Sequence, residues 1–337
     1  MDCLCCVDGG AGPNTDTEFL GSVCNLRASD GTEAVFPAEE GRYILYVIAG
    51  CPFAARPWAV LGFYGLSEKI PVVKLFPASY NDGWFFKPCT DGEKELCDMF
   101  PDAQVDDDPL HGSSHLRELY LKANPDFKGA ISVPLLWDSV KDTAVSNSSL
   151  GLAEMIATQM RCMGTRNKDV LLFPSRIDEP DEHKKHADLV KDLHVRVTTA
   201  VYKMNATKSG KEHDKLVDEY FETLEELQDR IQKNGPYLMG EKIRFADFVF
   251  FISLVRLDLA YQWRFGLGRR NVRENYPGLW DYSQRILNLP GVRETVLPRD
   301  IMALYFMTPK WVDGNGRTLP QVPESWEEKC QFGACSF

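Results

Sequence analysis

The sequence predicts an α/β domain in its first half, followed by an all-α domain. Three observations support this fold class. Short apolar runs alternate with a helix-like run over residues 41–76, as in a strand–helix–strand unit. From about Glu182 onward, apolar residues recur at helical spacing. The chain has 337 residues, which is enough for about two domains.

The central motif is a predicted strand, a turn and a helix. Tyr43 to Ile48 is an apolar, β-rich run that ends at Ala49 and Gly50. Cys51 follows at the turn, and Pro52 behind it suits the first position of a helix that extends to about Gly65. A thiol at a helix N-terminus faces unpaired N–H groups and the positive end of the dipole. The pattern therefore predicts a lowered pKa for Cys51.

This arrangement is typical of a thioredoxin-type redox site, but the second cysteine of a CxxC pair is missing, because Ala54 stands there. A single thiol has no internal partner, so it must form a mixed disulfide with another molecule and be released by another thiol. Glutathione is the obvious candidate. The alternative interpretation is that Cys51 is only a small buried apolar residue.

The rest of the first domain contains a second strand and a long insertion. Pro71 to Phe76 reads as a buried strand, which completes a right-handed βαβ unit. Residues 77–116 are acidic and loop-like, with an inserted loop predicted at about 85–115. Leu116 to Ala123 is a predicted short helix.

Two more strands and a helix are predicted to complete this domain. Ile131 to Trp137 reads as a strand interrupted by Pro134. A cis Val133-Pro134 bond at the strand start would accommodate the proline, whereas the alternative is a trans proline on an edge strand. Val140 to Ala144 returns as a hairpin. Asn147 to Ser149 then caps a helix that runs to about Met163.

The second half is predicted to be a helix bundle. Two amphipathic helices precede a break at residues 234–236, and a third, from Ile243 to Leu259, is apolar nearly all round, as expected at a bundle centre. Another helix is predicted from Gly278 to Leu289. The predicted organisation is a disordered tail (residues 1–35), a thioredoxin-like domain (36–165), a helical domain (180–308) and an irregular tail (309–337).

Composition restricts the function classes. The net charge of −11 argues against nucleic acid as a partner. No apolar stretch approaches the roughly 20 residues of a membrane helix, and no secretory or transit signal is visible, so a cytoplasmic location is expected. The ten cysteines show no zinc-type spacing, so no metal site is predicted. Cys3, Cys5 and Cys6 are either free thiols or a palmitoylation cluster.

Several motifs resemble the glutathionyl-hydroquinone reductases, the Xi class of cytosolic glutathione transferases. The similar segments lie in the same order and with similar spacing over roughly residues 36–306. They are GRYILYV with the Cys-Pro site, Gly83-Trp84, the DPL-x-G segment, LRELYLKANP, VPLLWD, AVYK, LVRLDLAYQWRF and YPGLWDYSQRILNLPGVRETV. The ordered set is specific, although each motif alone is weak.

The resemblance implies a fold, an activity and a site. Family members use a cysteine to attack the sulfur of a glutathionyl-hydroquinone, release the hydroquinone, and are freed by a second glutathione. Cys51 matches the nucleophile, and the implied partners are glutathione, an apolar, aromatic substrate and a second copy of the chain in a homodimer. The residues matched to the glutathione site are Phe53, Trp84, Val133, Pro134, Ser148 and Ser149. Those matched to the acceptor pocket are Tyr202, Tyr261, Tyr305 and Phe306.

The chain also departs from the family pattern. The usual CPWAHR reads CPFAAR here, so Phe53 replaces a tryptophan and Ala55 a histidine. Ser148 stands where a glutamate usually pairs with the γ-glutamyl ammonium, and Phe306 replaces a tyrosine. We therefore expect weak hydroquinone reductase activity. The alternatives are a glutathione-dependent isomerase, lyase or conjugating transferase, and a non-catalytic binding protein of the same fold.

Overall fold

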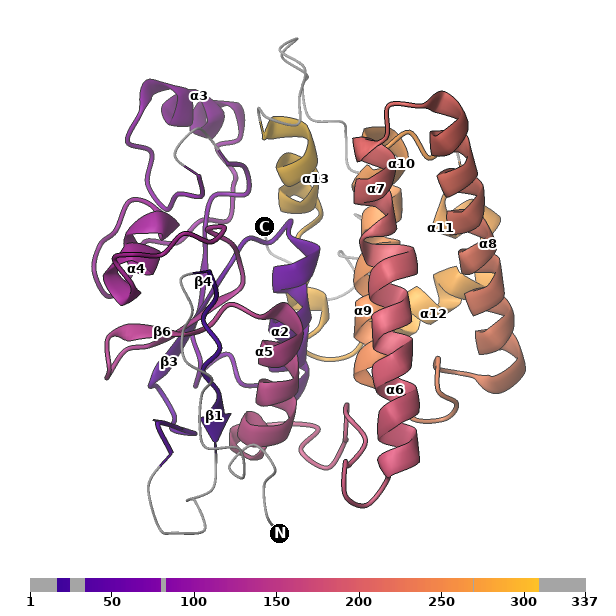
Figure 1. Ribbon diagram of the computed structural model, residues 1–337, viewed down its shortest axis with the longest axis horizontal. Helices are drawn as coiled ribbons and strands as arrows, with labels where there is room; N and C mark the ends of the chain where they lie inside the picture. The colour runs from indigo at the N-terminus through magenta and orange to yellow at the C-terminus, as the bar shows by residue number, and fades with distance from the viewer. Residues whose placement is uncertain (1–16, 25–33, 80–82, 269, 309–337) are drawn as a thin grey trace.

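A computed structural model describes residues 17–24, 34–79, 83–268 and 270–308. Figure 1 shows a sheet with its flanking helices on the left and a helix bundle on the right. The elements of the first part are β1 (Val23–Cys24), β2 (Phe36–Pro37), β3 (Tyr43–Val47), α2 (Pro52–Tyr64), β4 (Val72–Lys74), α3 (Asp91–Met99), α4 (Leu116–Ala123), β5 (Leu135–Asp138), β6 (Thr143–Ser146) and α5 (Ser149–Met155).

Helix α5 continues as two short helical turns, η1 (Ile156–Met160) and η2 (Arg161–Met163), so the helical segment ends where the sequence predicted, and the helical part begins after an irregular connection. Its elements are α6 (Pro180–Leu193), η3 (His194–Thr198), α7 (Ala200–Ala206), α8 (Gly210–Asn234), α9 (Phe245–Arg256), η4 (Leu257–Tyr261), α10 (Gln262–Arg264), α11 (Val272–Asn275), α12 (Pro277–Leu287), η5 (Arg293–Thr295) and α13 (Pro298–Met307). The predicted fold class is confirmed. The final helix α13, which the sequence analysis missed, carries Tyr305.

The main sheet has the strand order β4-β3-β5-β6. Strands β3 and β4 are parallel and joined by α2, as the βαβ prediction requires, whereas β5 and β6 are antiparallel to their neighbours. All five residues of β3 are buried, because α2 and α5 cover one face of the sheet and α4 packs beside β6. The carboxyl end of this central strand leads directly to Cys51.

The Val133-Pro134 peptide bond is cis, as predicted. Strand β5 begins only after the proline, at Leu135, because proline has no N–H to donate to the ladder. The predicted hairpin return lies slightly later than expected, at Thr143–Ser146. Ser148 caps α5, since its side chain accepts a hydrogen bond of 3.2 Å from the Gly151 N–H.

Part of the predicted disordered tail, residues 1–35, is ordered. Phe19 is fully buried against the rings of Tyr120 and Phe127, and strand β1 pairs in parallel with β2. A buried aromatic side chain removes a large apolar area from water, and this offsets the conformational entropy lost when its segment is ordered. Residues 1–16 and 25–33, and the predicted tail from residue 309, lie outside the described residues.

The segment predicted as a long loop at about 85–115 contains helix α3. Thr90 caps it, and Glu93 reaches back to the Thr90 N–H, so the two form a capping box that the acidic composition concealed. A second small core holds α3 and the preceding segment against α13. It consists of Phe76, Ala78, Phe85, Leu96, Phe100, Ala303 and Met307.

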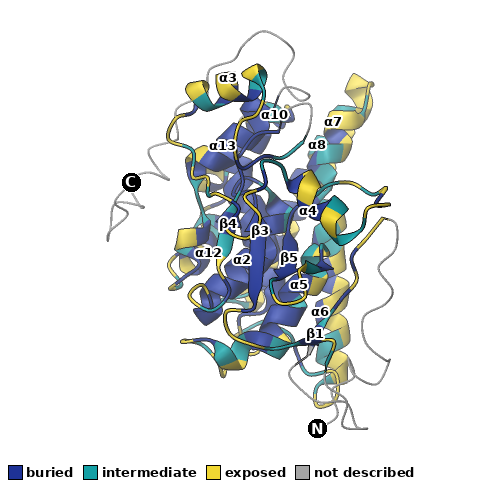
Figure 2. Cartoon of the chain, turned by 90° about the vertical axis from the view of Figure 1, so that its left-hand side faces the viewer, coloured by how far each residue is buried: buried dark blue, intermediate teal, exposed yellow. Residues whose placement is uncertain are grey.

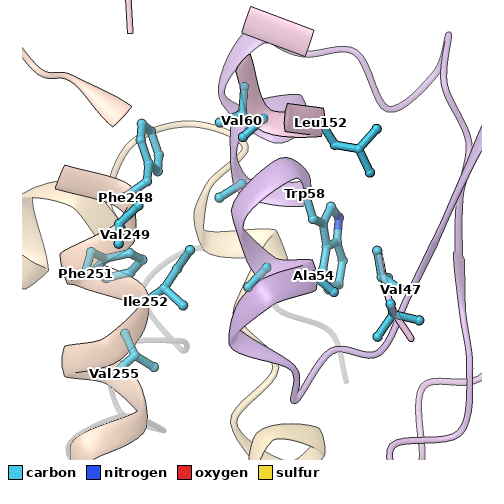
Figure 3. Packing of buried hydrophobic residues seen from close by; sticks show 14 of the residues in the cluster. Val47, Ala54, Trp58, Val60, Leu152, Phe248, Val249, Phe251, Ile252 and Val255 are labelled. Carbon is cyan, nitrogen blue, oxygen red and sulfur yellow. The ribbon is translucent and has the colours of Figure 1, made fainter. Parts of the chain in front are cut away.

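Helix α2 lies between the sheet domain and the helix bundle. Figure 3 shows Ala54, Trp58 and Val60 of α2 between α9 on one side and, on the other, Val47 of β3 and Leu152 of α5. Helix α9 is buried along its whole length, as its apolar sequence predicts. Figure 2 shows how burial varies across the molecule: α2 and β3 are buried, whereas much of α3 and α6 is exposed.

One backbone crossing fixes the distance between the two halves of the fold. Gly62 of α2 lies against Gly291, whose φ of +84° also favours glycine. A Cβ built on either residue would overlap the backbone of the other. Neither backbone can yield as a flexible side chain would, so both positions require glycine.

Gly62→Ala is therefore expected to lower the free energy of unfolding by about 1–3 kcal/mol, the usual cost of overpacking. Gly210→Ala is the matched control, because nothing lies within 4 Å of a Cβ built there and its φ is ordinary. Chemical denaturation of both variants checks this. Equal stability of the two variants would mean that the Gly62–Gly291 crossing is not tightly packed.

Candidate active site

Cys51 occupies the N-cap position of α2, with φ −72° and ψ 121°. Its N–H donates to the Ile48 carbonyl at 2.9 Å, which closes the turn after β3, and its own carbonyl accepts from the Ala55 N–H at 3.0 Å. Pro52 is the first helical residue, as predicted. The sulfur is half-buried at the end of the central strand.

The helical part holds the turn before Cys51 from the other side. Arg256, at the end of α9, donates from Nε to the Gly50 carbonyl at 3.0 Å and from Nη2 to the Ala49 carbonyl at 3.2 Å. Leu304 of α13 also packs on the turn, since a Cβ at Gly50 would lie 2.5 Å from its Cβ. The site is thus assembled from both halves of the chain.

The backbone of Val133 faces Cys51. The Cys51 Sγ lies 3.9 Å from the Val133 carbonyl oxygen, to which the thiol donates. The Val133 N–H has no hydrogen-bond partner among the described residues, because it lies two residues before the first paired residue of β5, Leu135. An unpaired backbone N–H next to the end of a ladder suits the backbone of a bound peptide. Glutathione, a peptide, fits this feature of the site.

Ser149 joins the first turns of α5 and α2. Pro57 cannot donate to the Phe53 carbonyl four residues before it, and the Ser149 Oγ donates to that carbonyl instead, at 2.7 Å. Its neighbour Ser148 is exposed and uses its hydroxyl as the N-cap of α5. Ser149 is therefore brought directly to the Cys-Pro motif, while Ser148 lies at the rim.

Trp84 is partly buried and packs against the large hydrophobic core. Its carbonyl accepts from the N–H of Leu116 at 2.9 Å, which ties the segment after β4 to the start of α4. These contacts do not involve Cys51. Its predicted place beside glutathione is therefore still a prediction.

Three of the predicted acceptor residues form one cluster. The hydroxyls of Tyr202 and Tyr305 are 2.9 Å apart, and the Tyr305 hydroxyl donates to that of Tyr261 at 3.3 Å. The Tyr202 ring stacks on Phe53 with their centroids 6.3 Å apart. This contact brings the tyrosine cluster from α7, η4 and α13 to the Cys-Pro motif.

Phe265 is an aromatic residue of this cluster that the sequence analysis did not select. Its ring centroid lies 5.4, 5.3 and 5.9 Å from those of Tyr202, Tyr261 and Tyr305, respectively. Phe306 is buried in the large core, but no ring contact joins it to the three tyrosines within the described residues. Adjacent residues of a helix point in different directions, so Phe306 does not join the tyrosine cluster that Tyr305 contacts.

The three phenols are neutral hydrogen-bonding groups at physiological pH. Burial raises the pKa of Tyr202 and of Tyr305 well above the ordinary value, and it also raises the pKa of Tyr261. Phenols that stay protonated can donate hydrogen bonds to an oxygen of a bound molecule. The cluster is therefore suited to orienting an aromatic ring that carries hydroxyl or carbonyl groups.

The prediction of a lowered pKa for Cys51 is wrong. Burial is the largest influence and raises the pKa of the thiol, while the N–H groups of Ala54 and Phe53 and the charges of Arg256 and Arg56 oppose it. The sequence argument considered the helix N-terminus but not the desolvation imposed by the helical part. Burial disfavours a thiolate because the charge loses its hydration.

Three polar residues near the site were not selected from the sequence. Arg56 and Arg256 are both almost fully buried, and His194 of η3 contacts Arg56 and the edge of Phe53. A signal for the arginines was present, because each is a cation within a mostly apolar helix, where a buried charge is uncommon. His194 had no comparable signal.

The described residues contain no group of three or more His, Cys, Asp and Glu side chains that could hold a metal ion. Within the same part of the chain, no helix is both long and apolar enough to cross a membrane.

The raised pKa predicts that Cys51 alkylates slowly at neutral pH and faster as the pH rises. In a variant that keeps only Cys51, the midpoint of the alkylation rate should lie above the ordinary thiol value of about 8.5. Burial disfavours the thiolate only in the folded protein, so the same variant in denaturant is the control and should show the ordinary midpoint. A folded-state midpoint below the denatured one would contradict the analysis.

Comparisons with known proteins indicate the family. Residues 191–294 match the family described as "Glutathione S-transferase, C-terminal domain". The chain is 31% identical over 281 residues to "Glutathionyl-hydroquinone reductase YqjG" of Escherichia coli, covering 83% of this chain and 79% of that protein. It is 28% identical over 318 residues to "Glutathione S-transferase omega-like 2" of Schizosaccharomyces pombe, covering 91% and 95%.

Solved structures lead to the same family. The glutathione-bound structure of YqjG from Escherichia coli superposes with a TM-score of 0.76 at 27% identity, covering 90% of this chain and 91% of that one. The Xi glutathione transferase of Phanerochaete chrysosporium gives a TM-score of 0.74 at 26% identity, covering 91% and 96%. With the sequence and the fold both similar to these proteins, the chain belongs to the glutathionyl-hydroquinone reductases, the Xi class of glutathione transferases, as a divergent member.

Proposed function

We propose that the protein is a glutathione-dependent thiol enzyme that reduces glutathionyl-hydroquinones or related glutathionyl conjugates through Cys51. One observation carries the proposal. The Cys51 sulfur lies beside the backbone of Val133, which suits a glutathione backbone, and the Phe53 ring two residues later stacks on Tyr202 of the cluster of neutral tyrosines, which suits an aromatic ring. A conjugate of glutathione with a hydroquinone has both parts.

The reaction would take place in two steps at one sulfur. Cys51, as thiolate, attacks the sulfur of the conjugate, so that an S–S bond forms and the bond from sulfur to the ring carbon breaks. The ring carbon keeps the electron pair and takes a proton. A second glutathione thiolate then attacks the glutathionyl sulfur, which frees Cys51 and yields glutathione disulfide. The ring carbon gains two electrons, while the thioether sulfur of the conjugate and the thiol of one free glutathione are oxidised to the disulfide.

The residues around Cys51 have separate roles in the proposal. Val133 would pair with the cysteinyl backbone of glutathione, and Phe53, Pro134 and Trp84 would border it. Ser149, with Ser148 at the rim, would face the γ-glutamyl end. The hydroxyls of Tyr202, Tyr261 and Tyr305 would hold the oxygens of the ring. Phe306, which is buried away from the phenol cluster, is not needed in this scheme.

The departures at positions 55 and 148 reduce the expected rate. Ala55 is buried and brings no proton-transferring group to the first turns of α2. Ser148 offers a neutral hydroxyl, already used as a cap, where a carboxylate would make a stronger, charge-assisted hydrogen bond. We therefore propose weak activity compared with a typical family member. A homodimer and a cytoplasmic location are further parts of the proposal that rest on the resemblance.

The test measures glutathione disulfide formed from glutathionyl-menadiol, coupled to glutathione reductase. Turnover is expected from the parent protein, while Cys51→Ser should abolish it with no loss in the thermal unfolding midpoint, because the Cys51 side chain makes no cap hydrogen bond to lose and serine is favoured at the N-cap position. Cys162→Ser is the control, since Cys162 is exposed. Unchanged turnover in Cys51→Ser would exclude the nucleophile role. No turnover by a parent protein with a reactive Cys51 would favour an isomerase, lyase or conjugating transferase.

A further inference from the structure

Arg56 is a buried cation in the first half of α2. Its side chain is 1% exposed, and it is the one charged residue of the helix. No carboxylate among the described residues lies within ion-pair distance of its guanidinium. An unpaired charge away from water is costly, so the presence of this arginine requires an explanation.

The hydrogen-bond partners of Arg56 are all neutral. Nη2 donates to His194 Nδ1 at 3.2 Å and to Thr198 Oγ1 at 3.1 Å, and the guanidinium carbon lies 5.2 Å from the centre of the Phe53 ring. Burial and the nearby arginine lower the pKa of His194, so the imidazole is neutral and accepts at Nδ1. Nε has no hydrogen-bond partner.

The other buried arginine of the site differs in this respect. Arg256 donates from all three of its nitrogens to the carbonyls of Gly50, Ile252 and Ala49. Its hydrogen bonds hold the turn in place, and their geometry explains its position. Arg56 keeps an unused donor, although burial lowers its pKa only to about 10 and leaves it charged at neutral pH.

Besides burial, which lowers it, the pKa of Arg56 is affected by the nearby ionisable groups of Cys51, Tyr261 and Tyr202. The two tyrosines are neutral at physiological pH because burial raises the pKa of each. Among these groups, Cys51 alone can supply a negative charge, as its thiolate. The guanidinium of Arg56 lies over the ring of Phe53, the second residue of α2, so the side chain extends toward the end of the helix that carries Cys51.

We propose that Arg56 is the buried counter-ion of the Cys51 thiolate and thus a positioning residue for the nucleophile. His194 and Thr198 hold its guanidinium from the helical part, so docking of the two halves of the chain places the charge. The inference rests on the proposed role of Cys51, but it concerns the ionisation of the sulfur and not the identity of the substrate.

The test measures alkylation of a variant that keeps only Cys51, with neutral iodoacetamide and anionic iodoacetate across a range of pH. Arg56→Gln should move the midpoint of the alkylation rate upward by about one pH unit or more, the usual effect of losing a nearby opposite charge. At the high-pH plateau, it should also lower the ratio of the iodoacetate rate to the iodoacetamide rate. A merely structural role would not move this ratio.

Three further variants make the test specific. Arg56→Lys should restore most of the midpoint, because the charge is kept. Thr198→Val removes one hydrogen bond to Arg56 and should shift the midpoint in the same direction by less. Arg196→Gln is the matched control, since Arg196 lies in the same segment η3 but is paired with Asp192 and Glu226 on the surface; no shift is expected.

The proposal is overturned if folded Arg56→Gln keeps the midpoint and the rate ratio of the parent protein. If Arg56→Gln does not fold, the same result in Thr198→Val overturns it. Alkylation needs no turnover, so the outcome is independent of the reductase assay. Shifted midpoints without any reductase turnover would uphold the counter-ion role and contradict the proposed function. Turnover through Cys51 with unshifted midpoints would contradict the counter-ion role and uphold the proposed function.

Discussion

The packing of helix α2 between the sheet and α9 is the constraint on which the rest of the structure depends. Its residues are buried almost without exception, because the sheet and α5 cover one side and α9 the other. At Gly62 the backbones of α2 and residue 291 touch, so the distance between the two halves is fixed. This packing positions the N-terminus of α2 and therefore Cys51.

The same packing decides the chemistry of Cys51. The backbone of Val133 approaches the sulfur, Arg256 holds the turn before Cys51, and the tyrosine cluster reaches the Cys-Pro motif through the ring of Phe53. Removing water raises the pKa of the thiol, yet it also strengthens the effect of each nearby charge, because the local dielectric constant is low. The pKa of the thiol therefore reflects a balance between its burial, which raises it, and the N–H groups of the first turn of α2 and two buried arginines, which lower it.

The sequence predicted the parts of this structure that depend on local pattern. The βαβ unit, the cis Val133-Pro134 bond, α9 and the gathering of Tyr202, Tyr261 and Tyr305 follow from apolar periodicity, proline positions or the family resemblance. The failures have a common cause. Contacts between residues far apart in the sequence determine the pKa of Cys51, the place of Phe265 in the tyrosine cluster and the ordering of the segment at Phe19. Helix α3 was missed because its acidic residues suggested a loop, although the Thr90–Glu93 capping box was present.

The central claim is that Cys51 forms a mixed disulfide with glutathione. The most direct measurement is intact mass of the protein after incubation with glutathione disulfide, followed by peptide mapping. We expect one glutathionyl group on Cys51, formed faster as the pH rises and removed by free glutathione. Exposed cysteines such as Cys89 and Cys162 provide the comparison. Adducts on those cysteines with none on Cys51, in folded protein and at alkaline pH, would contradict the account.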